Sequence, residues 1–74
     1  MNTFLLLEVP SEAPDYREAY LLEDLGDRIL CRAYKRRGEW IKSQIHFSKG
    51  DFTKRCKVLA DEEVKGIMNA EVAQ

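Results

Sequence analysis

Residues 28–47 read RILCRAYKRRGEWIKSQIHF, two strand-like runs on either side of a tight turn that contains glycine. Apolar and polar side chains alternate through both runs, which is the pattern of strands with one buried face. Arg36-Arg37-Gly38 predicts a three-residue hairpin loop, because glycine supplies the positive φ that such a loop needs. The resulting register has three informative pairs: Lys35 with Glu39, Tyr34 with Trp40, and Arg32 with Lys42.

The flanking segments predict further elements. Residues 3–9 (TFLLLEV) are apolar on both sides, which indicates a strand in the middle of a sheet or covered on both faces. Lys49-Gly50 predicts a second tight turn that pairs Phe47 with Phe52 and leads into a strand over 52–59. A C-terminal helix is expected over 61–73, with Asp61 as N-cap and an apolar stripe of Val64, Ile67, Met68 and Val72.

Residues 16–25 (YREAYLLEDL) fit two structures. They are good helix formers, Asp15 can cap a first turn and Gly26 can occupy the C′ position, so a helix is favoured. The alternative is a strand that continues through a hairpin at residues 25–28, where Gly26 suits a type II′ turn. Residues 10–15 (PSEAPD) read as a turn-rich connection.

Side chains alternate across a sheet, so the predicted register sorts residues onto two faces. The core face, which the C-terminal helix is expected to cover, collects Ile29, Cys31, Ala33, Ile41, Ser43, Ile45, Phe47, Phe52, Cys56 and Val58. The other face collects Arg32, Tyr34, Arg36, Trp40, Lys42, Gln44, His46, Arg55 and Lys57. On it Arg32 faces Lys42, and Lys42 faces Lys57, an arrangement of like charges that costs stability.

Charge is unevenly distributed along the chain. Residues 28–57 contain ten of the twelve Lys and Arg but two acids, a local charge of +8 in a protein of net charge −1. Such separation creates a basic surface suited to an acidic partner. The sequence pI of 5.8 nevertheless argues against a general nucleic-acid-binding domain, which typically exceeds about 9.

The basic face predicts a binding site with three kinds of contact. Its cations at Arg32, Arg36, Lys42, Arg55 and Lys57 suit phosphates or carboxylates, with Arg37 reaching out from the loop tip. Tyr34 and Trp40 suit stacking, while Gln44 and His46 suit hydrogen bonds. An alternative is internal compensation, in which residues 16–25 cover this face and neutralise it with Glu18, Glu23, Asp24 and Asp27.

Catalysis, cofactors and metals are not expected. His46 is the only histidine, no nucleophile or carboxylate is predicted beside it, and no phosphate-binding glycine loop is present. Cys31 and Cys56 are predicted to be buried thiols about 10 Å apart, too far for a disulfide. The run Phe4–Leu7 is too short to span a membrane and lacks the flanks of a signal peptide, so a cytoplasmic location is expected.

Together these features predict one α+β domain over residues 1–74, ordered β-α-β-β-β-α, with an antiparallel sheet packed on the C-terminal helix. If 16–25 is a strand, the alternative is a five-stranded meander or small barrel plus that helix. The expected function is a non-enzymatic inhibitor or adaptor that engages an acidic protein or protein–nucleic acid surface. Two alternatives remain open: a direct single-stranded DNA or RNA binder, and a homodimeric structural subunit with internally compensated charge.

Overall fold

The fold is α+β, with one five-stranded antiparallel sheet and one C-terminal helix. The computed structural model describes residues 3–9 and 17–72, with side chains as far as Asn69. Its elements are β1 (Thr3–Glu8), β2 (Arg17–Asp24), β3 (Ile29–Arg36), β4 (Glu39–Phe47), the 3₁₀ helix η1 (Asp51–Arg55), β5 (Lys57–Val58) and α1 (Asp61–Val72). Strands run in the order β4-β3-β2-β1-β5, so β1 is interior as predicted. The predicted connection 10–15, the Asp15 cap and the Val72 side chain lie outside the described residues.

The segment 16–25 is a strand, so the favoured helix prediction is wrong and the five-stranded alternative is confirmed. Leu21 and Leu22 explain why, because they are adjacent in sequence and only 0% and 2% exposed. They belong to two different core clusters, and only an extended backbone points successive side chains to opposite faces. The turn that follows also matches the strand alternative: Gly26 has φ +97°, and the Leu25 N–H donates to the Arg28 carbonyl at 2.9 Å.

A bulge at Arg32 reverses the faces of β3. Leu22 pairs with Cys31 while the preceding Leu21 pairs with Ala33, so Arg32 is an extra residue in the ladder. Cys31 therefore packs with Leu5, Leu22 and Ile29 on one side, and Ala33 packs with Leu21 and Leu59 on the other. Regular alternation predicts Cys31 and Ala33 on the same face of the sheet, and this prediction is wrong.

The β3–β4 hairpin is tighter than predicted. Its loop has two residues, Arg37 and Gly38, with φ values of +54° and +79°, as a type I′ turn requires. Arg36 now pairs with Glu39, so every neighbouring pair shifts by one residue. The predicted pairs Lys35–Glu39, Tyr34–Trp40 and Arg32–Lys42 are therefore wrong, and a one-residue slip moves side chains to the opposite face.

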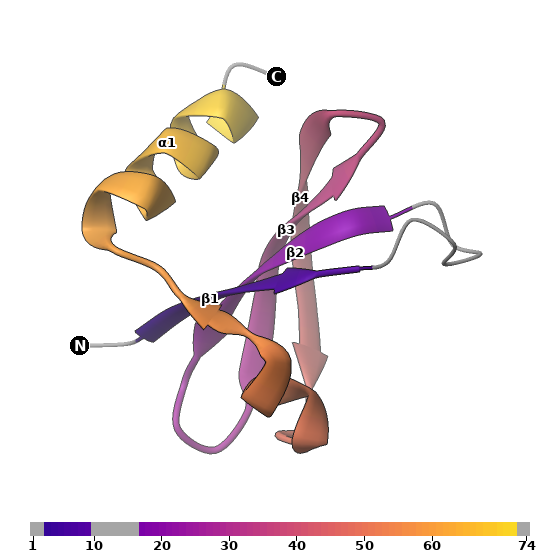
Figure 1. The fold of residues 1–74 in the computed structure, drawn as a ribbon, viewed down its shortest axis with the longest axis vertical. Helices are drawn as coiled ribbons and strands as arrows, with labels where there is room; N and C mark the ends of the chain where they lie inside the picture. The colour runs from indigo at the N-terminus through magenta and orange to yellow at the C-terminus, as the bar shows by residue number, and fades with distance from the viewer. Residues whose placement is uncertain (1–2, 10–16, 73–74) are drawn as a thin grey trace.

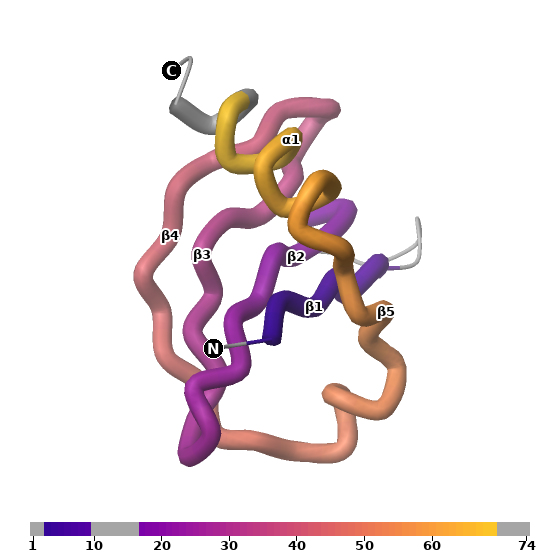
Figure 2. The backbone as a smooth tube through the Cα atoms, turned by 90° about the vertical axis from the view of Figure 1, so that its left-hand side faces the viewer, coloured from indigo at the N-terminus to yellow at the C-terminus, as the bar shows by residue number. Residues whose placement is uncertain are grey.

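Residues 48–56 cross from one edge of the sheet to the other, as Figure 2 shows. The predicted strand over 52–59 is instead η1 followed by the short β5, which pairs with β1 and not with β4. Phe52 and Cys56 pack on the cluster of Leu5, Leu22, Ile29 and Cys31 during this crossing. We call the side that they cover the crossover face. The predicted core residues Ile45, Phe47 and Val58 remain 48%, 39% and 66% exposed.

Helix α1 covers the opposite side of the sheet, which we call the helix face (Figure 1). Val64, Ile67 and Met68 pack toward Leu21, Ala33 and Leu59, which confirms the first three positions of the predicted stripe. The expectation that the helix covers Ile29 and Cys31 is wrong, because the crossing segment covers those residues. Ala60 and not Asp61 occupies the N-cap, where its N–H donates to Glu63 at 3.4 Å as in a capping box.

The turn provides a first test. Arg37 holds a left-handed backbone conformation that favours asparagine or glycine, so Arg37→Asn should stabilise the protein by about 0.5–1 kcal/mol. Urea unfolding of the variant would measure the gain. The exposed Arg36→Asn, where φ is not positive, serves as the control and should change stability by less than about 0.5 kcal/mol. Equal effects at both positions would contradict the assigned turn.

Candidate basic hairpin and groove

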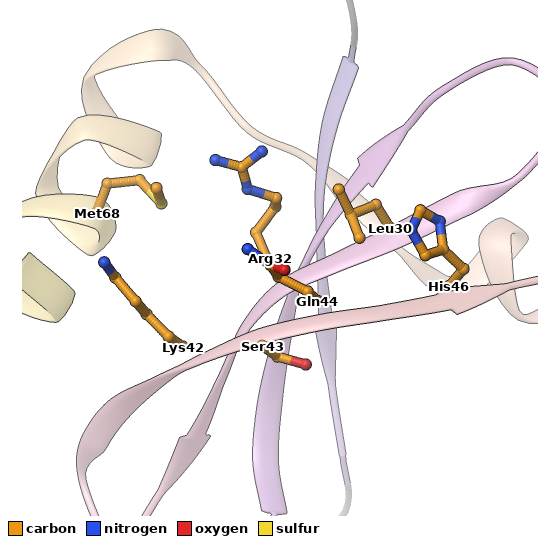
Figure 3. Close-up of a pocket in the computed structure, with 7 residues that line it drawn as sticks. All are labelled: Leu30, Arg32, Lys42, Ser43, Gln44, His46 and Met68. Carbon is orange, nitrogen blue, oxygen red and sulfur yellow. The ribbon is translucent and has the colours of Figure 1, made fainter.

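A groove of about 300 Å³ separates α1 from β3 and β4 on the helix face (Figure 3). It gathers four of the residues predicted to bind, namely Arg32, Lys42, Gln44 and His46. In Figure 3 the Arg32 guanidinium and the Lys42 ammonium both extend toward the side where Met68 lies, whereas the Ser43 hydroxyl points the other way. Leu30 and Met68 give the groove an apolar component. The arrangement suits a partner that combines negative charge with some apolar surface.

Arg32 is held in the groove by an acid from the neighbouring strand. Its Nη1 donates to Glu23 Oε1 at 3.2 Å, and the Glu23 residue is only 9% exposed. Arg32 alternates with Cys31, so its side chain lies on the helix face beside Glu23, and the bulge places the following Ala33 on the same face. A buried carboxylate needs such a cation, so Arg32 has a structural role besides any role in binding.

His46 and Lys42 differ in how they are held. His46 Nδ1 accepts a hydrogen bond of 2.9 Å from Arg28 Nε, and Arg28 in turn pairs with Asp27 at 3.0 Å. This contact fixes the His46 ring near the far end of the groove. Lys42 is exposed and makes no ion pair with the described residues, so its charge faces solvent.

The two predicted stacking residues are not neighbours. Tyr34 lies on the crossover face with Tyr20, and the Arg17 guanidinium lies over its ring at 4.6 Å from the centroid. Trp40 lies on the helix face, half-buried against the cluster that α1 covers. The predicted aromatic platform therefore does not form, because the tighter turn places these side chains on opposite faces.

The remaining predicted residues are dispersed around the molecule. Arg55 is exposed at the end of η1, away from the groove. Lys57 lies on β5 and pairs with Glu63 of α1 at 3.6 Å, so the predicted contact between Lys42 and Lys57 is wrong. Arg36 and Arg37 lie at the exposed tip of the β3–β4 hairpin.

Acids of the first third neutralise part of the basic stretch, as the internal-compensation alternative supposes. Besides Glu23 with Arg32, Asp24 pairs with Lys49 at 3.1 Å and Glu18 accepts the Gly38 N–H at 3.3 Å. The hydrogen bond from the Gly26 N–H, assisted by Lys49, lowers the pKa of Asp24. These contacts hold the acids along β2 and its turn, where they pair with Arg32 and Lys49, whereas Glu18 contacts the hairpin tip only through the Gly38 backbone N–H.

Four cations at or near the tip of the β3–β4 hairpin form no ion pair with an acid among the described residues. These hairpin cations are Lys35, Arg36, Arg37 and Lys42, none of which forms an ion pair within residues 3–9 and 17–69. They lie within eight residues of one another along a two-strand hairpin, so their fields add. Lys54 and Arg55 of η1 also form no ion pair among the described residues, so the hairpin is the larger of the two uncompensated groups in the +8 stretch.

The described residues offer little else for chemistry. No group of three or more His, Cys, Asp or Glu could hold a metal ion within the searched part of the chain. Burial raises the pKa of the Cys31 and Cys56 thiols, which are both free, and so disfavours the nucleophilic thiolate. No helix among these residues is long and apolar enough to cross a membrane.

Some residues of the site escaped the sequence reasoning. Leu30 and Met68 both line the groove. The predicted register did not bring them together, because it placed the C-terminal helix on the face that carries Ile29 and Cys31. Lys35 was placed opposite Glu39 and so was left out of the basic face, and only the correct turn length reveals it. Arg28 lies 18 residues from His46, and its contact depends on the distal register of β3 and β4.

Comparisons with protein-family models, with curated proteins and with solved structures return no match for this chain. Function must therefore be argued from the geometry of the site alone.

Arg32 and Lys42 should behave differently on substitution, although both lie in the groove. Arg32→Met leaves the Glu23 carboxylate without its described cation, so stability should fall by about 1–3 kcal/mol. Lys42→Met, the matched control, should change stability by less than about 0.5 kcal/mol. Urea unfolding of both variants would measure the difference. Equal losses would show that Lys42 also has a structural partner.

Proposed function

We propose that this chain is a non-enzymatic binding protein, of inhibitor or adaptor type, that engages an acidic surface of a partner protein or protein–nucleic acid complex. The interaction is centred on the hairpin cations and extends into the groove beside them. The supporting observation is the contrast within the basic stretch. Arg28, Arg32, Lys49 and Lys57 have acidic partners in the fold, whereas the four hairpin cations and the two cations of η1, Lys54 and Arg55, have none among the described residues. The hairpin is the larger of these two groups, and it adjoins the groove.

Arg37 adds a second line of support. Its φ of +54° is costly for arginine, and asparagine would fit the same turn better. Residues that break a local rule without a structural gain are often found at functional sites. The exposed position of Arg37 at the tip of the hairpin suits a contact with a partner and offers no compensating contact within the described structure.

Direct binding of single-stranded nucleic acid receives less support from the geometry. Base stacking needs exposed aromatic rings beside the cations. Tyr34 lies under Arg17 on one face, and Trp40 packs on the other, so the hairpin cations have no paired stacking platform. An acidic protein surface requires only the charges and shape that the hairpin and groove provide.

A pair of double variants tests the proposed function. Arg36→Ser/Arg37→Ser and Lys54→Ser/Arg55→Ser remove the same charge from exposed adjacent positions, one pair in the hairpin and one in η1. The tagged protein would be used to capture partners from an extract of the organism that encodes it, and binding to each purified partner would then be titrated. We expect the hairpin variant to lose at least about tenfold in affinity and the η1 variant less than about twofold.

Two results would contradict this function. One is an equal loss of partner affinity in both double variants, which would show that affinity depends on the net charge of the protein and not on the position of the hairpin cations. The other is tight, salt-sensitive binding of the unmodified protein to a single-stranded oligonucleotide, which would favour the nucleic-acid alternative.

A further inference from the structure

Strand β4 forms a long open edge of the sheet. It is nine residues long and pairs with β3 alone in a sheet whose opposite terminal strand, β5, has two residues. In a two-residue hairpin the pair that flanks the loop is hydrogen-bonded, and hydrogen-bonded pairs then alternate with non-bonded pairs along the strands. Arg36 and Glu39 flank this loop, so Ile41 directs its backbone groups to β3 and Lys42 directs its own to the outer edge.

Pairing of an edge strand with another chain is commonly discouraged by shortness, proline, lysine or a bulge. β4 carries Lys42, and its ladder with β3 is irregular between Cys31 and Ala33, but the strand is nine residues long. β4 contains no proline, and its exposed residues include Ile45 at 48% and Phe47 at 39%. Long edges with exposed apolar side chains are the sites at which extended peptides add to a sheet.

The two faces of β4 have different chemistry. Lys42, Gln44 and His46 alternate along the helix face and line the groove. Ile41, Ile45 and Phe47 alternate along the crossover face, where they pair with Tyr34, Cys31 and Ile29. Because side chains of a paired strand extend these same two faces, an added strand would place alternate residues beside cations and beside apolar groups.

We propose that β4 pairs with an extended segment of a partner protein in which acidic and apolar residues alternate. This inference rests on the proposed function and specifies how the acidic partner is recognised. The acidic side chains lie on the helix face near Lys42 and the groove, and the apolar side chains cover Ile45 and Phe47. Main-chain hydrogen bonds to the outer edge supply affinity, and the alternation supplies selectivity.

Charge selects this occupant over a second copy of the chain. Antiparallel pairing of two β4 strands across a twofold axis keeps the two helix faces on the same side of the joined sheet. In that arrangement the hairpin end of each β4 lies beside the far end of the other, where residues 44–47 include no acid, so both sets of hairpin cations stay without an acidic partner. An acidic segment instead neutralises those cations. Nucleic acid cannot extend the ladder, because it has no peptide groups.

Synthetic peptides allow a direct test. The probe is an eight-residue peptide of alternating glutamate and valine, blocked at both ends and labelled with a fluorophore. Its control has the same composition with the glutamates in one block and the valines in another. Titration followed by fluorescence anisotropy should show the alternating peptide binding at least about tenfold more tightly than the block peptide.

Backbone methylation then separates strand pairing from side-chain attraction. Successive residues of a strand direct their N–H groups to opposite edges, so methylating the valine nitrogens and methylating the glutamate nitrogens block different edges. One methylated peptide should lose binding, and the other should stay within about twofold of the unmodified peptide. The peptide that loses binding also reveals the direction of the added strand.

Three results would overturn the inference: an alternating peptide that binds no better than the block peptide, equal effects of the two methylations, or self-association of the free protein that the alternating peptide does not disperse. The first two results leave the proposed function intact if both acidic peptides still bind and Arg36→Ser/Arg37→Ser weakens that binding. Absence of binding by every acidic peptide would count against the strand pairing and the proposed function together.

Discussion

The burial of two adjacent leucines on opposite faces of one strand governs this structure. Leu21 and Leu22 are almost completely inaccessible to solvent, so both sides of the sheet centre must be covered. Helix α1 covers one side and residues 48–56 cover the other. Among the described residues β4 pairs with β3 alone, so its outer edge is not paired with another strand.

The same constraint determines which charges are satisfied. The acids of β2 and its turn lie beside the sheet centre, where Glu23 meets Arg32 and Asp24 meets Lys49. The hairpin extends away from that region and keeps its cations uncompensated among the described residues. Because the hairpin cations form no ion pair among the described residues, ion pairing within the fold does not explain why the hairpin is basic. Its charge and the unfavourable backbone of Arg37 are better explained by a contact outside the fold.

Sequence reasoning predicted the features that depend on local chemistry. The turn at Gly38, the interior position of β1 and the C-terminal helix follow from φ requirements and from apolar patterning, although the loop at Gly38 is one residue shorter than predicted. The turn at Gly26 follows only from the strand alternative for residues 16–25. The placement of Lys42, Gln44 and His46 on one face also follows, because these residues are two apart in sequence.

The missed features depend on contacts between distant parts of the chain. The helix-forming residues of 16–25 become a strand because β1 and β3 bury both of its faces, and tertiary packing outweighs intrinsic propensity. The bulge at Arg32 leaves no local signal, yet it reverses the face of Ala33. The separation of Tyr34 from Trp40 results from a loop one residue shorter than predicted.

Pairing of β4 with a partner strand requires that its outer edge be open in the free protein. Amide hydrogen exchange measured by NMR at residue resolution tests this most directly, because neighbouring amides of one strand serve as controls for each other. With an open edge, we expect strong protection of the Leu22, Cys31 and Ile41 amides and fast exchange of the Lys42 amide. Protection of Lys42 equal to that of Ile41 in a monomeric sample would contradict it, because another part of the chain would then occupy the edge.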